Sequence, residues 1–187
     1  MGGFFAMGFV GAAIMLGIFT ANLQLGFVQI EGTNDWMQAL KQIPMVFISA
    51  FGEELFLRVF VFIPLMYLAG NKRIALVGSS VVFCFLHMPM DIISVLSYFL
   101  AGLMYGFAFL KFKSIWAAVG LQVAWNYFQG AVFGFPVSSG VSNGYFILGI
   151  EDSWIWNGGG IGPEGSVFGV LCRVLIIGII FFIPLYI

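Results

Sequence analysis

The sequence predicts an all-α fold: a polytopic membrane helix bundle with about six transmembrane helices, in a single domain over residues 1–187. Composition is the first reason, because 61% of the residues are hydrophobic, only 8% are charged, and the mean hydropathy is +1.07. A water-soluble domain of this length carries more charge. The second reason is that apolar segments recur along the chain, and the third is that the loops between them alternate in charge.

Six apolar segments can be drawn, separated by polar residues, glycine or proline. The first covers about residues 3–29 and lacks the basic start and small-residue cleavage site of a signal peptide, so we interpret it as a span. The others follow at about 44–69, 74–89, 92–110, 114–131 and 166–187. Because the third and fifth segments are short for a hydrocarbon core of ~30 Å, we expect them to be buried helices that line a central site.

The loop charges predict the orientation of the bundle. Loops 70–73 and 111–113 hold lysine and arginine, whereas loop 132–165 holds only acidic charges and loop 30–43 is mainly acidic. Basic loops stay on the cytoplasmic side of a membrane. We therefore expect both ends of this chain in the cytoplasm, with loops 30–43 and 132–165 outside.

Three loop features have local interpretations. Asn34-Asp35-Trp36 is typical of the capped start of a short helix at the membrane interface. Loop 132–165 is long and rich in Gly, Ser and Trp, so we expect it to fold partly back onto the protein. Gly160-Ile-Gly-Pro-Glu-Gly165 has a nucleotide-binding spacing, but it follows no predicted strand, and a tight turn into the last helix explains it better.

Composition and spacing also exclude several kinds of partner and site. The formal net charge is −1 and no basic run occurs, which argues against nucleic acid as a partner. Cys84 and Cys172 lie in separate apolar segments and form neither a disulfide framework nor a CxxC site. Gly102-x-x-x-Gly106 is best explained by close helix packing. The chain opens abruptly in apolar sequence, so we expect N-terminal helices to precede it.

The second apolar segment holds Glu53, Glu54 and Arg58 near its middle. A carboxylate at bilayer depth costs roughly 2.5–3.5 kcal/mol, so three ionisable groups in one span need an explanation. Glu54 and Arg58 are four residues apart and are expected to form a structural ion pair on one helix face. Glu53 points about 100° away and has no such partner within the helix, so it is the carboxylate left for chemistry.

Three further polar residues lie in other apolar segments. His87, the one histidine of the chain, is near the end of the third segment, and Gln122 and Asn126 share a face of the fifth. Each residue alone is more often structural, but together with Glu53 they form a set suited to hydrolysis. Glu53 can act as general base for water, and His87 can orient the water or protonate the leaving amine. The two amides can donate N–H groups to an oxyanion.

These residues resemble the three motifs of the CAAX-protease and bacteriocin-processing family (CPBP, or Abi) of intramembrane proteases. The family's EExxxR motif matches Glu53-Glu54-Leu-Phe-Leu-Arg58, and its FxxxH motif matches Phe83-Cys-Phe-Leu-His87. Its HxxxN motif is represented by Gln122-Val-Ala-Trp-Asn126. The similarity covers most of the chain.

The resemblance implies an all-α bundle, commonly of about eight transmembrane helices, of which this chain has room for about six. It also implies peptide-bond cleavage, including removal of the C-terminal tripeptide from prenylated CAAX proteins. It places Glu53, Glu54, His87, Gln122 and Asn126 in the catalytic motifs. In this resemblance Glu53 activates water, His87 assists, and the Gln122–Asn126 pair holds the oxyanion.

The sequence departs from the family pattern at two positions. Val59 replaces a glycine that often follows the arginine, which we interpret as a change of packing. Gln122 replaces the histidine of the third motif; its amide can donate N–H groups, but it cannot carry a proton. A catalytic zinc takes three protein ligands, but the sequence offers two candidates, Glu53 and His87. The case for a zinc cofactor is therefore weakened, and a metal-free mechanism is favoured.

We therefore expect an intramembrane endopeptidase, a multi-pass protein of a prokaryotic plasma membrane, that cleaves a membrane-associated protein or peptide, lipidated or plain. The alternative is a catalytically inactive scaffold or bacteriocin-immunity-type protein that binds a partner in the same cavity. A transporter or channel is disfavoured because the sequence has no inverted repeat and no paired broken helices.

Overall fold

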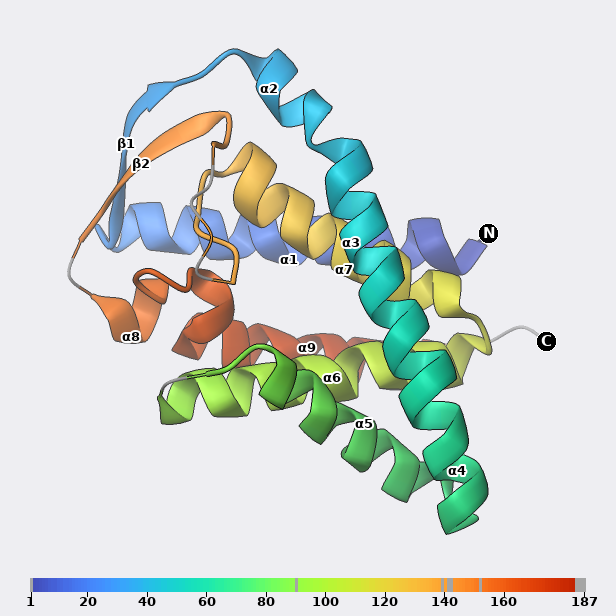
Figure 1. Ribbon diagram of the computed structural model, residues 1–187. Coiled ribbons are helices and arrows are strands. Elements are labelled where there is room, and N and C mark those ends of the chain that lie inside the picture. Colours follow the sequence, from blue (N-terminus) through green and yellow to red (C-terminus); the bar gives the residue numbers. More distant parts are fainter. Residues whose placement is uncertain (1, 90, 139, 141–142, 152, 184–187) are drawn as a thin grey trace.

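The computed structural model describes residues 2–89, 91–138, 140, 143–151 and 153–183. In the described residues each of the six apolar segments forms a helix or a continuous helical run, which confirms the all-α prediction (Figure 1). The predicted end of the sixth segment, residues 184–187, lies outside the described residues. These are α1 (Gly2–Gln24), the run over residues 43–69, α5 (Lys72–Leu86), α6 (Ile92–Phe112), the run over residues 115–132, and α9 (Val167–Phe182).

Two of these helical runs contain a π-helical stretch. In the first, α3 (Ile43–Leu55) continues through the π-helical η1 (Phe56–Phe62) into α4 (Ile63–Ala69). In the second, α7 (Ile115–Asn126) continues into the π-helical η2 (Tyr127–Val132). Wider π turns inside α-helices are frequent at functional sites. Here η1 begins two residues after Glu54, and η2 begins directly after Asn126.

The helices begin where a side chain can cap the free backbone N–H groups. Asn71 accepts a hydrogen bond from the N–H of Arg73 at the start of α5, and Ser166 accepts one from the N–H of Gly169 at the start of α9. Asp91 accepts bonds from two N–H groups at the start of α6. At the other end, α4 stops at Gly70, whose φ of +60° is a left-handed conformation that glycine adopts readily.

Helix α7 lies at the centre of the bundle, packed against α1, α3 and α6. Eight of its twelve residues are buried, and the small ones among them, Ala117, Ala118, Gly120 and Ala124, let its neighbours approach closely. At Gly120 a Cβ atom would lie 2.2 Å from the carbonyl oxygen of Phe4 in α1, so only glycine fits. The expectation of a buried fifth segment is therefore confirmed.

The third segment, in contrast, is only half buried. Helix α5 turns one face to α6 but exposes Ile74, Val77 and Phe85 on the other. The expectation of a buried third helix was wrong on this point, because an apolar side chain suits lipid and the protein interior equally. Gly102 of α6 makes the close approach to α5 that its spacing predicted: a Cβ there would lie 2.7 Å from the Cα of Ser80.

The loops contain structure that the sequence only partly predicted. Helix α2 (Trp36–Lys41) is the expected short helix, and the Asp35 side chain caps it by accepting a bond from the N–H of Met37. Loop 132–165 does fold back: β2 (Phe146–Ile150), α8 (Trp154–Asn157) and the 3₁₀ turn η3 (Pro163–Gly165) lie within it. The turn η3 leads directly into α9, as expected for the Gly-Pro segment.

The first segment ends earlier than predicted. We expected it to extend to about residue 29, but α1 ends at Gln24, and β1 (Val28–Thr33) pairs antiparallel with β2. Gly26, with a φ of +72°, turns the chain between them. The pairing partner lies more than 100 residues later, so local periodicity could not reveal it. This small sheet brings the two acidic loops to one end of the bundle, away from the N-terminus (Figure 1).

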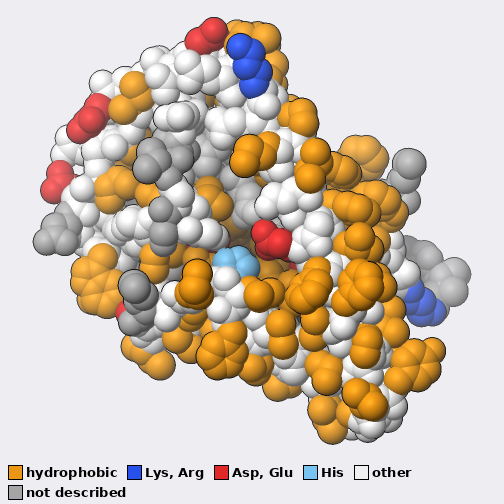
Figure 2. Space-filling model, in the orientation of Figure 1, with side chains coloured by type: hydrophobic (Ala, Val, Ile, Leu, Met, Phe, Trp, Pro, Cys, Tyr) orange, Lys and Arg blue, Asp and Glu red, His pale blue; other side chains and the backbone are white. Residues whose placement is uncertain are grey.

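Two helices, α1 and α6, are long and apolar enough to cross a membrane by length and composition. Helix α9 is apolar but shorter. Hydrophobic side chains cover much of the face shown in Figure 2. Many of the largest are well exposed, including Phe5, Phe9, Tyr67, Leu68 and Phe85.

Candidate active site

Glu54 and Arg58 form the expected ion pair, and it is completely buried. The guanidinium donates two hydrogen bonds to the carboxylate, from Nε at 2.8 Å and from Nη2 at 3.2 Å, and neither side chain has exposed surface. Arg58 Nη1 also lies 3.5 Å from the hydroxyl of Ser79 on α5. Gly106 of α6 makes room, because a Cβ there would lie 2.8 Å from Nη1. The pair therefore joins η1 to α5 and α6.

Glu53 points to a different side of α3 and stays partly accessible, with 37% of its side chain exposed. Gln122 of α7 donates a hydrogen bond from Nε2 to its Oε2 atom at 2.7 Å. Ser49, one turn earlier in α3, donates to Oε1 at 3.3 Å. Within α3 the partner of Glu53 is the uncharged Ser49. The serine was overlooked.

His87 ends α5 next to this carboxylate. Its Nδ1 atom lies 2.9 Å from the carbonyl oxygen of Phe83, which can only accept a hydrogen bond, so Nδ1 carries the hydrogen. The ring is held between the rings of Phe83 and Tyr98, with centroids 4.4 Å and 4.6 Å away. Its Nε2 atom faces Glu53 Oε2 at 4.0 Å.

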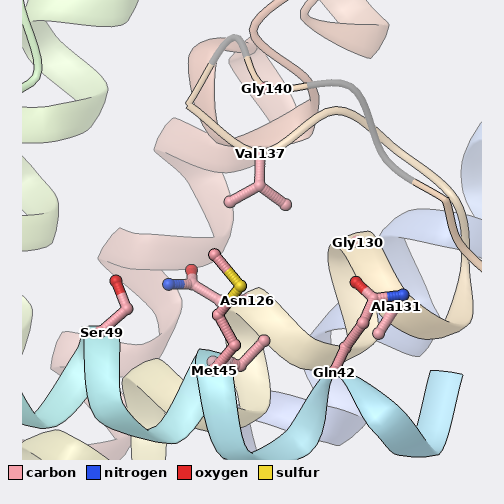
Figure 3. A pocket seen from close by; sticks show the side chains of 9 residues that line it. Gln42, Met45, Ser49, Asn126, Gly130, Ala131, Val137 and Gly140 are labelled. Atoms are coloured by element: carbon pink, nitrogen blue, oxygen red, sulfur yellow. The ribbon is translucent and has the colours of Figure 1, made fainter.

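The two amides of the third motif have different surroundings. Gln122 is 2% exposed; its Nε2 contacts Glu53, whereas its Oε1 is buried and has no hydrogen-bond partner among the described residues. Asn126, one turn later, lines a neighbouring cavity together with Ser49 (Figure 3). Their shared helix face is as predicted, but only Gln122 contacts the carboxylate.

Two cavities are lined by successive parts of α3 at this site. One, of about 540 Å³, contains Glu53 and His87 and is bordered by apolar residues of η1 and of the end of α5, and by Ser138. The other, of about 200 Å³, contains Asn126 and Ser49. In Figure 3 the Val137 and Met45 side chains point into this second cavity from opposite walls. The segment 137–138 thus contributes one residue to each cavity.

The sequence analysis missed a second buried ion pair. Arg173 of α9 is 1% exposed and Glu164 of η3 is 4% exposed, with 3.9 Å between Arg173 Nη2 and Glu164 Oε2. The signal was present, because Arg173 is an ionisable residue inside an apolar segment, like Glu53. Its partner precedes the helix in a loop, so helical spacing did not indicate the pair.

The side chains at the site do not fit a zinc ion with three protein ligands. Glu53 and His87 are the two metal candidates that the sequence offered, and the third neighbour of this pair is the amide of Gln122. Among the described residues, no group of three or more His, Cys, Asp or Glu side chains is placed to hold a metal ion. The cysteines do not contribute: Cys84 and Cys172 are separate free thiols in the described part of the chain.

Comparison with protein families gives one match. The family model described as type II CAAX prenyl endopeptidase Rce1-like matches residues 35–128, which is half of the chain and includes Glu53, His87 and Asn126. Comparison with curated proteins and with solved structures found no match. The family and the apolar helices together indicate an integral membrane protein of a protease family. This chain belongs to the Rce1-like family of CAAX prenyl endopeptidases.

Proposed function

We propose that this protein is a multi-pass intramembrane endopeptidase that hydrolyses a peptide bond with a water molecule activated by Glu53. The observation that carries the proposal is the meeting of three helices at one carboxylate. Glu53 comes from α3, Gln122 of α7 donates to it at 2.7 Å, and His87 at the end of α5 faces it at 4.0 Å. The family membership supports the reaction class.

The separation between Glu53 and His87 suits a bridging water. At 4.0 Å, Oε2 and Nε2 are too far apart for a direct hydrogen bond, but one water can bond to both. Because Nδ1 carries the ring hydrogen, Nε2 is a free acceptor that can orient this water. Glu53 takes a proton from the water as its oxygen attacks the peptide carbonyl carbon.

The remaining steps use the amides and return the proton. The carbonyl oxygen becomes an oxyanion, which the second N–H of Gln122 and the amide of Asn126 can stabilise. When the C–N bond breaks, protonated Glu53 gives its proton to the leaving nitrogen, with His87 beside it to assist the transfer. The products are a carboxylic acid and an amine. In this scheme Gln122 needs only to donate hydrogen bonds, so its inability to carry a proton does not block the reaction.

Glu54 and Arg58 hold the site without reacting. Both carboxylate oxygens of Glu54 face Arg58, and the pair is sealed from solvent. The role we assign to Glu54 within the motif is therefore to fix η1 against α5 and α6, so that Glu53 on the neighbouring face keeps its direction.

The surroundings of the site favour a substrate that arrives within the membrane. The cavity that contains Glu53 is bordered by Phe56, Leu86 and Met88, which are 46%, 55% and 81% exposed. Figure 2 shows the histidine and an acidic side chain in a hollow among hydrophobic side chains, on the flank of the helices. We propose a membrane-associated protein or peptide, lipidated or plain, that enters from the bilayer.

The loop charges support an orientation of the bundle in the membrane. The acidic loops that the β1–β2 sheet joins lie at one end of the bundle, and the positive-inside rule puts this end outside the cytoplasm. We propose that the protein lies in a prokaryotic plasma membrane. The alternative function, an inactive member that binds a peptide in the same cavities, differs in one respect: it predicts binding without cleavage.

The test is cleavage of a mixed library of prenylated and plain peptides by the purified protein in proteoliposomes, read by mass spectrometry. We expect Glu53→Gln to lower the rate by about 10²–10⁴-fold or more, and we expect Glu31→Gln, an exposed carboxylate on β1, to have no effect. Cleavage that survives a chelator supports the metal-free scheme. Absence of cleavage by the wild type and by Gln122→His would contradict the proposal and favour the binding protein.

A further inference from the structure

The reaction scheme above does not use the second buried ion pair, Glu164–Arg173. Glu164 is in η3, and Arg173 is two turns into α9. Arg173 Nη1 donates to the backbone carbonyl oxygen of Glu164 at 2.7 Å and contacts the hydroxyl of Ser97 on α6. Its guanidinium also lies 4.9 Å from the ring centroid of Trp125, between Gln122 and Asn126 in the sequence of α7. The arginine is therefore held by several groups besides the Glu164 carboxylate.

The Glu164 carboxylate is directed mainly at other residues. Its Oε1 atom accepts a hydrogen bond from the Tyr98 hydroxyl at 3.3 Å. The same atom accepts bonds from the backbone N–H and, at 3.0 Å, from the hydroxyl of Ser138. Only Oε2 faces Arg173, at 3.9 Å. One carboxylate oxygen thus connects a residue of α6 to a residue of the loop that follows η2.

Both of these partners border the reacting groups. The ring of Tyr98 stacks on the ring of His87 at 4.6 Å with 26° between their planes. Ser138 lines the cavity that contains Glu53 and His87. Its φ of +47° is a left-handed conformation that serine rarely adopts and that costs of order 1 kcal/mol or more. The two bonds from Glu164 stabilise this conformation.

We propose that Glu164 is a positioning residue of the site: through Tyr98 it fixes the ring plane of His87, and through Ser138 it fixes the wall of the Glu53 cavity. The assignment rests on the proposed function only in so far as it treats His87 and Glu53 as the reacting groups. The contacts themselves can be tested whether or not the protein cleaves a peptide. A purely structural pair would stabilise the fold but leave the His87 ring unchanged.

The single histidine makes a direct test available. We would label the protein with isotopic histidine, purify it through a histidine-free tag, and record the imidazole NMR signals of His87 in detergent micelles. Tyr98→Phe keeps the stacked ring but removes the hydroxyl, and Glu164→Gln keeps an acceptor for Ser138 and Tyr98. We expect shifted or broadened His87 signals in Tyr98→Phe, a larger change in Glu164→Ala, and partial return towards the wild-type signals in Glu164→Gln.

Tyr67→Phe is the matched control, because Tyr67 is 80% exposed at the far end of α4. If the His87 signals of Tyr98→Phe coincide with those of the wild type and of Tyr67→Phe, the proposal is wrong. Should Glu164→Ala fail to fold, Tyr98→Phe and Glu164→Gln still decide the question. Failure of the proposed function is seen separately, as a wild type that does not cleave while its His87 signals still respond to these variants.

Kinetics add a second measurement where the wild type cleaves. A misplaced catalytic group lowers the rate of the chemical step, and a displacement of about 1 Å can cost about 10²-fold. We expect Glu164→Ala and Tyr98→Phe to lower kcat with little change in KM, and Glu164→Gln to recover part of the loss. Equal kcat values in Tyr98→Phe and Tyr67→Phe would also contradict the proposal.

Discussion

The molecule has two buried acid–arginine pairs, Glu54–Arg58 and Glu164–Arg173, and their carboxylates differ in the groups that they bond to. Glu54 directs both oxygens to Arg58, four residues later in the same helical run. Glu164 gives one oxygen to Ser138 and Tyr98, and Arg173 is held largely by the Glu164 carbonyl and by Ser97. In the first pair the carboxylate bonds only to its arginine among the contacts described, and the pair anchors one helical run. In the second, the carboxylate also bonds to Ser138 of the loop after η2 and to Tyr98 of α6, whose ring stacks on His87.

The largest effect that this comparison predicts is on Arg58. Replacing it by methionine leaves the Glu54 carboxylate buried without a partner, which costs about 3–5 kcal/mol. We expect Arg58→Met to lower the free energy of unfolding in detergent by this amount or to prevent folding. Arg73→Met, at an exposed arginine near the start of α5, should unfold like the wild type. Equal stability of the two variants would show that the Glu54–Arg58 pair is not an anchor.

Replacing the other arginine should have a smaller effect on stability. In Arg173→Met the Glu164 carboxylate keeps its bonds from Ser138 and Tyr98, so we expect a loss of about 1–3 kcal/mol. Thermal unfolding of Arg173→Met and Arg58→Met side by side measures the difference. If Arg173→Met were the less stable of the two, the Glu164–Arg173 pair would be the stronger anchor and the comparison would be reversed.

A smaller effect still concerns the space around Arg58. Gly106→Ala would place a Cβ atom 2.8 Å from Arg58 Nη1 and 2.4 Å from a methyl group of Leu76. We expect a loss of about 1–3 kcal/mol from overpacking. Gly178→Ala in α9 is the control, because nothing lies within 4 Å of its added Cβ. Unfolding curves that coincide for the two variants would mean that α6 can move away from the arginine.

The smallest effect is expected at Ser138. In Ser138→Gly the left-handed backbone conformation is relieved while the hydroxyl bond to Glu164 is lost, and the N–H bond remains. These opposite contributions are each of order 1 kcal/mol. We expect a net change within about 0.5 kcal/mol, as for typical surface substitutions. A loss well beyond this range would mean that the hydroxyl contributes more than the backbone strain costs.

The sequence was sufficient to predict the six helical segments and the ion pair of the first motif. Apolar length located the six helical segments, and the spacing of four residues identified the Glu54–Arg58 pair, because both are local features of a helix. The sequence analysis grouped Glu53 with Gln122 only as members of one candidate catalytic set and predicted no direct contact between them. The 2.7 Å bond between them depends on how α3 crosses α7, which no local pattern encodes.

Contacts between distant segments were out of reach of the sequence analysis. The β1–β2 pairing joins residues more than 100 positions apart, and each strand alone is a short apolar stretch. Glu164 lies in a Gly-rich loop before the last helix, where no helical spacing relates its carboxylate to Arg173. Arg173 was the available signal, because an ionisable residue inside an apolar segment indicates a buried partner.

The most direct test of the account is the cleavage rate of Glu53→Gln, normalised to folded protein and compared with Glu54→Gln and the wild type. Glu53 is partly exposed and Glu54 is fully buried against Arg58, so the two neighbouring substitutions separate chemistry from stability. We predict that Glu53→Gln folds as stably as the wild type and does not cleave, whereas Glu54→Gln is less stable. A Glu53→Gln protein that cleaves at the wild-type rate would contradict the account.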